Sequence, residues 1–174
     1  SNVKQDFLIK NLADLDKQLS KINIPLIVLQ TDNFTALPED LKKFTETHQI
    51  NSCHWNNEFG VNENKRDEAV ERLLSTASIQ ITRHHDQVIY EPGFLRTGQD
   101  KPFSVFTPFK RRWIENFTMS FLDLKQTDKP LKKTNLTSDL SALTLEKFHQ
   151  VNMDVWPAGE ANALARLQEF LDHK

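Results

Sequence analysis

The chain has 174 residues, with 22 Lys or Arg and 24 Asp or Glu, and a formal net charge of −2. This length allows one ordinary domain with a real core. The charge balance excludes a globally basic protein, so contact with nucleic acid would need a local patch or parts not present here. The single cysteine, Cys53, excludes an internal disulfide and zinc clusters. No apolar run approaches the roughly 20 residues of a membrane span, and no secretory leader is visible, so we expect a cytoplasmic protein.

Helical and extended patterns alternate from the start of the chain. Apolar residues at helical spacing predict a helix over residues 4–21. The branched apolar run at residues 24–29 predicts a strand buried on both faces, as in a parallel sheet. Pro38 is expected to open a helix over residues 38–48, and residues 50–55 are a candidate strand.

The alternation continues beyond residue 60. Residues 62–76 are predicted to form a helix with Asn62 as a candidate N-cap, and short extended segments follow at residues 78–82 and 87–90. This order indicates βαβ units and an α/β fold with a parallel sheet. The four glycines form neither a dinucleotide-binding loop nor a P-loop, so classical nucleotide binding is not supported.

The second half of the chain is less regular. Pro-Gly and Thr-Gly pairs mark a long connection before residue 107. Thr107 and Pro108 predict a helix start, with a hydroxyl cap followed by proline at the first position. Residues 123–150 are polar and without a strong period, which is typical of a linker. Apolar residues at helical spacing predict a last helix over residues 158–172.

Four segments in this order resemble the DNA photolyase and cryptochrome family. They are Phe7 to Leu29, the run Val61-Asn62-Glu63-Asn64-Lys65-Arg66-Asp67, the stretch from Val88 to Lys110 with Thr97-Gly98 and Val105-Phe106-Thr107-Pro108-Phe109-Lys110, and Trp156 to Leu171. The resemblance is to the N-terminal domain of a bacterial cyclobutane pyrimidine dimer photolyase. It implies a Rossmann-like parallel sheet flanked by helices, then a linker and the first helix of a helical domain.

The resemblance also implies a division of the chain. Residues 1–122 would be a partial α/β antenna domain, residues 123–155 an interdomain linker, and residues 156–174 the start of the C-terminal flavin-binding helical domain. Family members begin with two central strands, the first carrying Trp-Phe-Arg-x-Asp-Leu-Arg, and both are absent here. Their absence would separate the strand near residues 25–29 from the strand near 51–55. We therefore expect a portion of a longer protein, or a chain that folds only by rearranging or pairing with another copy.

The function implied by the resemblance is light-driven repair. The whole protein would be a deoxyribodipyrimidine photo-lyase, in which reduced FAD donates an electron to a cyclobutane pyrimidine dimer in UV-damaged DNA. The FAD site and the catalytic residues would lie outside this chain, which would not be competent alone. A second pigment, methenyltetrahydrofolate in the bacterial folate type, would sit in the N-terminal domain and pass excitation energy to the flavin.

By the same resemblance, Asn62 and Glu63 would bind the folate. An amide and a carboxylate can match the donor and acceptor array at the edge of a pterin. The alternative is purely structural, with Asn62 capping the helix and Glu63 complementing the helix dipole. Two other whole-protein functions stay open: a cryptochrome-type blue-light signalling protein, and an α/β small-molecule-binding domain without photochemistry.

Other polar clusters have simpler interpretations. Asp67 is expected to form a structural salt bridge, with Arg72 or a residue outside the helix rather than with the adjacent Arg66. The adjacent His84 and His85 are not expected to bind a metal, because neighbouring side chains on an extended segment point to opposite faces. The basic run of residues 110–112 is expected to be solvated rather than to contact DNA.

Overall fold

The computed structural model describes residues 2–122, 132–143, 152 and 155–173. The chain forms two compact units, one of residues 31–125 and one of residues 1–30 with 126–174. No helix among the described residues is long and apolar enough to cross a membrane.

The unit of residues 31–125 is built on a β-α-β crossover. Strands β1 (Ser52–Asn56) and β2 (Gln80–His84) pair in parallel, with Ser52 opposite Gln80 and Asn56 opposite His84. Helix α3 (Val61–Thr76) connects them, and helix α2 (Leu37–Thr47) precedes β1. The predicted α/β fold with parallel strands is confirmed, and the four predicted elements lie within about two residues of the observed ones.

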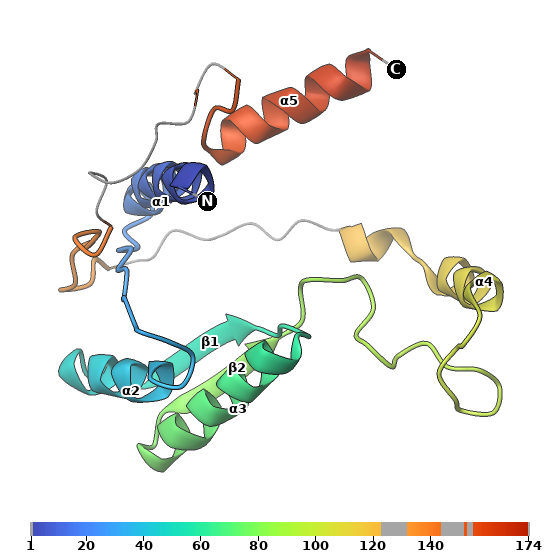
Figure 1. Cartoon of the computed structure of the whole chain (residues 1–174), viewed down its shortest axis with the longest axis horizontal. Coiled ribbons are helices and arrows are strands. Elements are labelled where there is room, and N and C mark those ends of the chain that lie inside the picture. Colours follow the sequence, from blue (N-terminus) through green and yellow to red (C-terminus); the bar gives the residue numbers. More distant parts are fainter. Residues whose placement is uncertain (1, 123–131, 144–151, 153–154, 174) are drawn as a thin grey trace. The chain divides into compact units, whose positions relative to one another are not determined.

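The core of this unit lies between the helices and one face of the sheet. Leu74 of α3 is completely buried, and Val70 and Ile79 are 4% and 8% exposed. Side chains from α2, β1 and β2 pack around these three residues: Leu37, Leu41, Cys53, Trp55, Ala77 and Ile81. Helices α2 and α3 therefore cover the same face of the two strands (Figure 1). Cys53 is half-buried in this packing.

The rest of this unit is a long connection followed by α4 (Phe106–Asn116) and the 3₁₀ turn η1 (Met119–Leu122). The extended segment expected at residues 87–90 forms no strand. Instead, Tyr90 packs against Phe94 and Trp113, with ring centroids 5.3 and 5.6 Å away. Helix α4 begins before the predicted Thr107 cap: its N-cap is Val105, without a side-chain hydrogen bond. Pro108 still fits because the first turn has no intrahelical partner for its backbone nitrogen.

The strand predicted at residues 24–29 is wrong as a buried sheet strand. In the described residues it makes one isolated bridge, between Ile27 and Asp139. The backbone of Val28 donates to the carbonyl of Asp139 at 2.9 Å, and Asp139 donates to Leu26 at 2.9 Å. These residues belong to a different compact unit from β1. Among the described residues the run makes this one bridge and joins no sheet, because a strand forms only where a partner offers backbone groups to pair with.

The second unit contains helices α1 (Asn2–Lys21) and α5 (Glu160–Asp172), close to the predicted bounds. Before α5, the backbone N–H of Gly159 donates to Asn11 Oδ1 at 2.9 Å. Gly159 has φ of 102°, and a Cβ at this position would lie 2.6 Å from Asp14 Oδ2. Both the backbone conformation and the close approach therefore require glycine. Of the expected linker, residues 123–131, 144–151 and 153–154 lie outside the described residues.

Candidate functional site

The candidate site lies where the carboxyl end of β1 meets the amino end of α3. In parallel α/β sheets ligands bind outside the carboxyl ends of the strands, and a helix amino end adds orphan N–H groups and a partial positive charge. Residues 57–60 form the short loop between the two elements. This placement brings Asn62 and Glu63 to the edge of the sheet where a ligand would be expected.

Asn62 and Glu63 occupy the first turn of α3. The N-cap is Gly60, with extended backbone angles and no side-chain hydrogen bond, so the prediction of Asn62 as the cap is wrong. Asn62 is the second helical residue and is exposed, while Glu63 is half-buried. The Glu63 carboxylate folds back over Gly60, where an added Cβ would overlap it. Glycine therefore gives this carboxylate its place beside the helix amino end.

Neither side chain is engaged by another described residue. No hydrogen bond or ion pair within the described ranges involves the Asn62 amide or the Glu63 carboxylate. The amide offers donors and an acceptor, and the carboxylate offers acceptors. Their availability and their position at a helix amino end fit a ligand edge that presents both N–H donors and acceptors.

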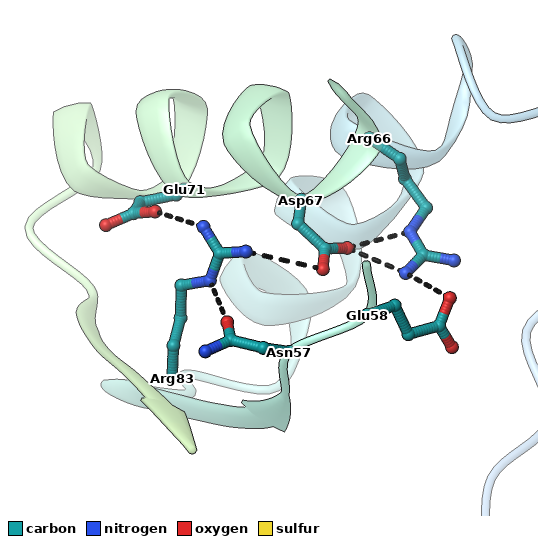
Figure 2. Close-up of polar contacts among 6 residues, drawn as sticks. All are labelled: Asn57, Glu58, Arg66, Asp67, Glu71 and Arg83. Atoms are coloured by element: carbon teal, nitrogen blue, oxygen red, sulfur yellow. Dashed lines mark hydrogen bonds and ion pairs between the residues drawn. The ribbon is translucent and has the colours of Figure 1, made fainter. Parts of the chain in front are cut away.

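A polar network beneath this turn fixes the loop to the helix (Figure 2). Asp67 is the central member, with a side chain 5% exposed. Arg66 reaches Asp67 Oδ1 through Nε at 2.8 Å and Nη2 at 2.7 Å. The same Nη2 lies 3.5 Å from Glu58 Oε2 in the loop after β1, and the guanidinium lies over the Phe34 ring at 5.2 Å. Arg66 of α3 therefore links the loop residue Glu58 to Asp67 on the same helix.

Arg83 extends the network to β2. Its Nε donates to Asn57 Oδ1 at 2.7 Å, its Nη1 lies 3.3 Å from Glu71 Oε2, and its Nη2 lies 3.7 Å from Asp67 Oδ2 (Figure 2). Asp67 is therefore a structural salt-bridge residue, as predicted, and Arg83 is a partner outside the helix, which was one of the two predicted alternatives. The adjacent Arg66 is a second partner that was not expected. Partial burial alone would lower the pKa of Arg66, but the hydrogen bond and charge of Asp67, with Glu58, raise it above its ordinary value.

The sequence analysis missed Asn57, Glu58 and Arg83. The sequence could have predicted that Arg83 faces the helices. Side chains alternate along a strand, so Arg83 shares the face of Ile79 and Ile81, which pack on the helices. A cation on that face needs a buried carboxylate, and Asp67 is the acidic residue that the helix period places there.

Histidines lie on the opposite face of the sheet. His54 Nδ1 and His84 Nε2 are 3.1 Å apart, whereas the ring of His85 lies near Phe59, with centroids 6.0 Å apart. The adjacent His84 and His85 thus have different neighbours. No group of three or more His, Cys, Asp or Glu residues in the described segments is placed to hold a metal ion.

These observations define an α/β domain with a parallel β-α-β unit and polar side chains near the carboxyl end of its first strand. A family model for DNA photolyase matches residues 1–132. The chain therefore belongs to the DNA photolyase family.

Individual relatives agree with this assignment. The deoxyribodipyrimidine photo-lyase of Vibrio cholerae is 27% identical over 173 residues, which cover 97% of this chain and 36% of the relative. That of Escherichia coli is 28% identical over 161 residues, covering 91% and 33%. The crystal structure of a bacterial class III photolyase from Agrobacterium tumefaciens matches with a TM-score of 0.72 at 21% identity, over 97% of this chain and 35% of that one, and supports the fold. The chain thus spans about a third of the length of these relatives.

Proposed function

We propose that this chain is the antenna-side part of a deoxyribodipyrimidine photo-lyase, a light-driven, flavin-dependent enzyme that repairs cyclobutane pyrimidine dimers in DNA. The observation that carries the proposal is the unengaged amide and carboxylate of Asn62 and Glu63 at the amino end of α3. The similarity to proteins named deoxyribodipyrimidine photo-lyase, over 97% of this chain for the Vibrio cholerae protein, supports the class of activity.

In this proposal Asn62 and Glu63 hold the antenna pigment. The Glu63 carboxylate accepts N–H groups from a pterin edge, and the Asn62 amide supplies both a donor and an acceptor. Arg66, Asp67 and Glu58 are positioning residues, because their contacts fix the loop and the helix turn that carry the two binding side chains. When bound, methenyltetrahydrofolate would supply absorption of light and transfer of excitation energy to the flavin.

The remaining assignments belong to the same proposal. FAD, the lesion pocket and the catalytic residues are assigned outside this chain, so UV-damaged DNA is a partner of the whole protein. Residues 1–122 are the partial antenna domain, residues 123–155 the linker, and residues 156–174 the start of the flavin-binding domain. The exposed residues 110–112 are left without a DNA role, since Arg112 already pairs with Glu115 at 3.8 Å. A cytoplasmic location is part of the proposal.

The pigment assignment can be tested in the full-length protein that contains these residues. Glu63→Ala removes the proposed acceptor and should weaken folate retention by about 10- to 100-fold, since a lost hydrogen bond to a charged group is worth roughly 1.5–3 kcal/mol. Glu68→Ala is the matched control, because Glu68 is an exposed glutamate on the same helix. Pigment and flavin content are measured by absorption spectroscopy. Equal folate content in the Glu63→Ala and Glu68→Ala proteins would remove Glu63 from the site.

The repair assignment needs a separate assay. The full-length protein with reduced flavin is illuminated together with an oligonucleotide that contains a pyrimidine dimer, and dimer loss is followed by chromatography. Loss of dimers under light, and not in the dark, is expected. Persistence of the dimer with both pigments bound would favour a cryptochrome-type signalling protein, and a colourless protein would favour the small-molecule-binding alternative.

A further inference from the structure

Gly60, the N-cap of α3, stands at a position where the backbone does not require glycine. Its φ of −68° and ψ of 147° lie in the extended region that every residue type adopts. Gly93 and Gly159, by contrast, have positive φ values of 88° and 102°. Helix capping does not require glycine either, because an N-cap favours Asn, Asp or Ser, whose side chains accept an N–H of the first turn. The reason for glycine at this position must therefore be the space around it.

The Glu63 side chain fills the volume that a side chain at residue 60 would occupy. A Cβ added to Gly60 would overlap Glu63 Oε2, and it would lie 2.8 Å from Cδ and 3.6 Å from Cγ of the same residue. A Cβ added to Gly98, in contrast, would meet no atom within 4 Å. Because the atoms met at Gly60 are the far end of a flexible side chain, an added methyl group would move the carboxylate and leave the backbone in place.

The Glu63 carboxylate lies against the N-cap without serving as a cap. Glu63 is the third residue of α3, from which a glutamate can reach back and accept the N-cap N–H. Within the described ranges, no hydrogen bond joins the Gly60 N–H to this carboxylate. The loop that carries Gly60 is held instead through Glu58, which pairs with Arg66 at 3.5 Å. The place of the carboxylate therefore depends on the empty space over Gly60, and its acceptor atoms stay available to a ligand.

We infer that Gly60 is a positioning residue for the pigment site and acts through Glu63. Its missing side chain lets the Glu63 carboxylate lie at the helix amino end, beside the Asn62 amide on the neighbouring residue. A rigid ligand edge can use both groups only if each is held within about 0.5 Å of its productive place. A side chain at residue 60 would displace the carboxylate and leave the amide where it is. This inference rests on the proposed function, because it assigns Gly60 a part in the same site.

Two substitutions of Gly60 in the full-length protein test the inference. Gly60→Ala and Gly60→Asn should each weaken the binding of methenyltetrahydrofolate by about tenfold, as measured by equilibrium dialysis with absorption detection. The urea midpoint of unfolding should not fall, and Gly60→Asn should raise it slightly because asparagine is a better N-cap. Weaker pigment binding by a fold of undiminished stability is a result that a purely structural role would not produce. Gly98→Ala is the matched control and should change neither quantity, since its added Cβ meets open space.

A double-mutant cycle shows whether Gly60 acts through Glu63. Adding Gly60→Ala to the Glu63→Ala protein should cause no further loss of folate affinity, because the carboxylate that it displaces is already absent. A second loss of about tenfold in that background would overturn the inference, and so would a lowered urea midpoint for Gly60→Ala. If Glu63→Ala loses folate while Gly60→Ala binds it as well as Gly98→Ala does, the inference alone is wrong. If Glu63→Ala itself binds folate normally, the pigment assignment under the proposed function is wrong, and the role of Gly60 with it.

Discussion

The two compact units bury their apolar residues to very different degrees. In residues 31–125, Leu74, Val70 and Ile79 form a closed core that α2, α3 and both strands share. In the other unit, Ile9 is the buried hydrophobic residue among those described, at 7% exposure, and the α5 residues Leu164, Leu167 and Leu171 are each more than half exposed. A β-α-β crossover covers one sheet face by itself, whereas an amphipathic helix needs a surface from elsewhere. The contrast predicts one unit that is stable by its own contacts and one that depends on further surfaces.

The largest expected effect is in the core of the first unit. Leu74→Ala removes the fully buried side chain and should lower the free energy of unfolding by about 2–5 kcal/mol. The matched change Leu167→Ala in α5 should alter it by less than about 0.5 kcal/mol. Urea unfolding followed by circular dichroism measures both. Equal losses for the two variants would contradict the contrast between the units.

The polar network gives the next largest effect. Asp67→Asn keeps the volume but leaves Arg66 and Arg83 without their shared carboxylate, and should cost about 1–3 kcal/mol. Glu71→Gln removes the exposed partner of Arg83 and should cost less than about 1 kcal/mol. The same unfolding assay applies. If the Glu71 variant loses as much stability as the Asp67 variant, the network is not centred on Asp67.

The second unit has one position with a comparable local constraint. Gly159→Ala forces an alanine into a positive φ and against Asp14, at a cost of about 1–2 kcal/mol to the start of α5. Gly98→Ala is the control, since a Cβ there meets no atom within 4 Å. The expected readout is faster amide exchange at the first turn of α5, with α3 unchanged. Faster exchange of α3 as well would mean that the two units are energetically coupled.

The smallest effect concerns Cys53. Burial raises the pKa of the Cys53 thiol, so less thiolate is present at pH 8 than in an unfolded chain, and alkylation by iodoacetamide should be about several-fold slower. A raised folded-state pKa stabilises the fold below the unfolded pKa, and this contribution disappears as pH rises through the folded value. Alkylation as fast as in urea would show that the α2–β1 packing is open.

The sequence predicted the elements of residues 37–84 well because their patterns are local. The apolar period of α3 and the Pro38 start of α2 depend on neighbours in sequence. The run at residues 24–29 was mispredicted as a buried strand because a strand exists only through its partners, and composition cannot show whether they are present. The Asn62 cap was mispredicted because Gly60, two residues earlier, has the extended backbone that starts the helix.

The candidate site was only partly visible in the sequence. Asn62 and Glu63 came from the family resemblance, and their assignment as pigment ligands stays a prediction. The Arg83 contacts were missed because they join residues 12 to 26 positions apart in sequence. Such long-range pairs depend on the parallel register of β1 and β2, which no local pattern encodes.

Residue-resolved hydrogen exchange on the whole chain tests the contrast between the units most directly. The account predicts that amides in the middle of α3, around Val70 and Leu74, exchange slowest and with one shared free energy of opening, while those in the middle of α5 exchange at least about a hundredfold faster. Protection in α5 equal to that in α3 would contradict the claim that the β-α-β unit is stable by its own contacts and that α5 awaits a further surface.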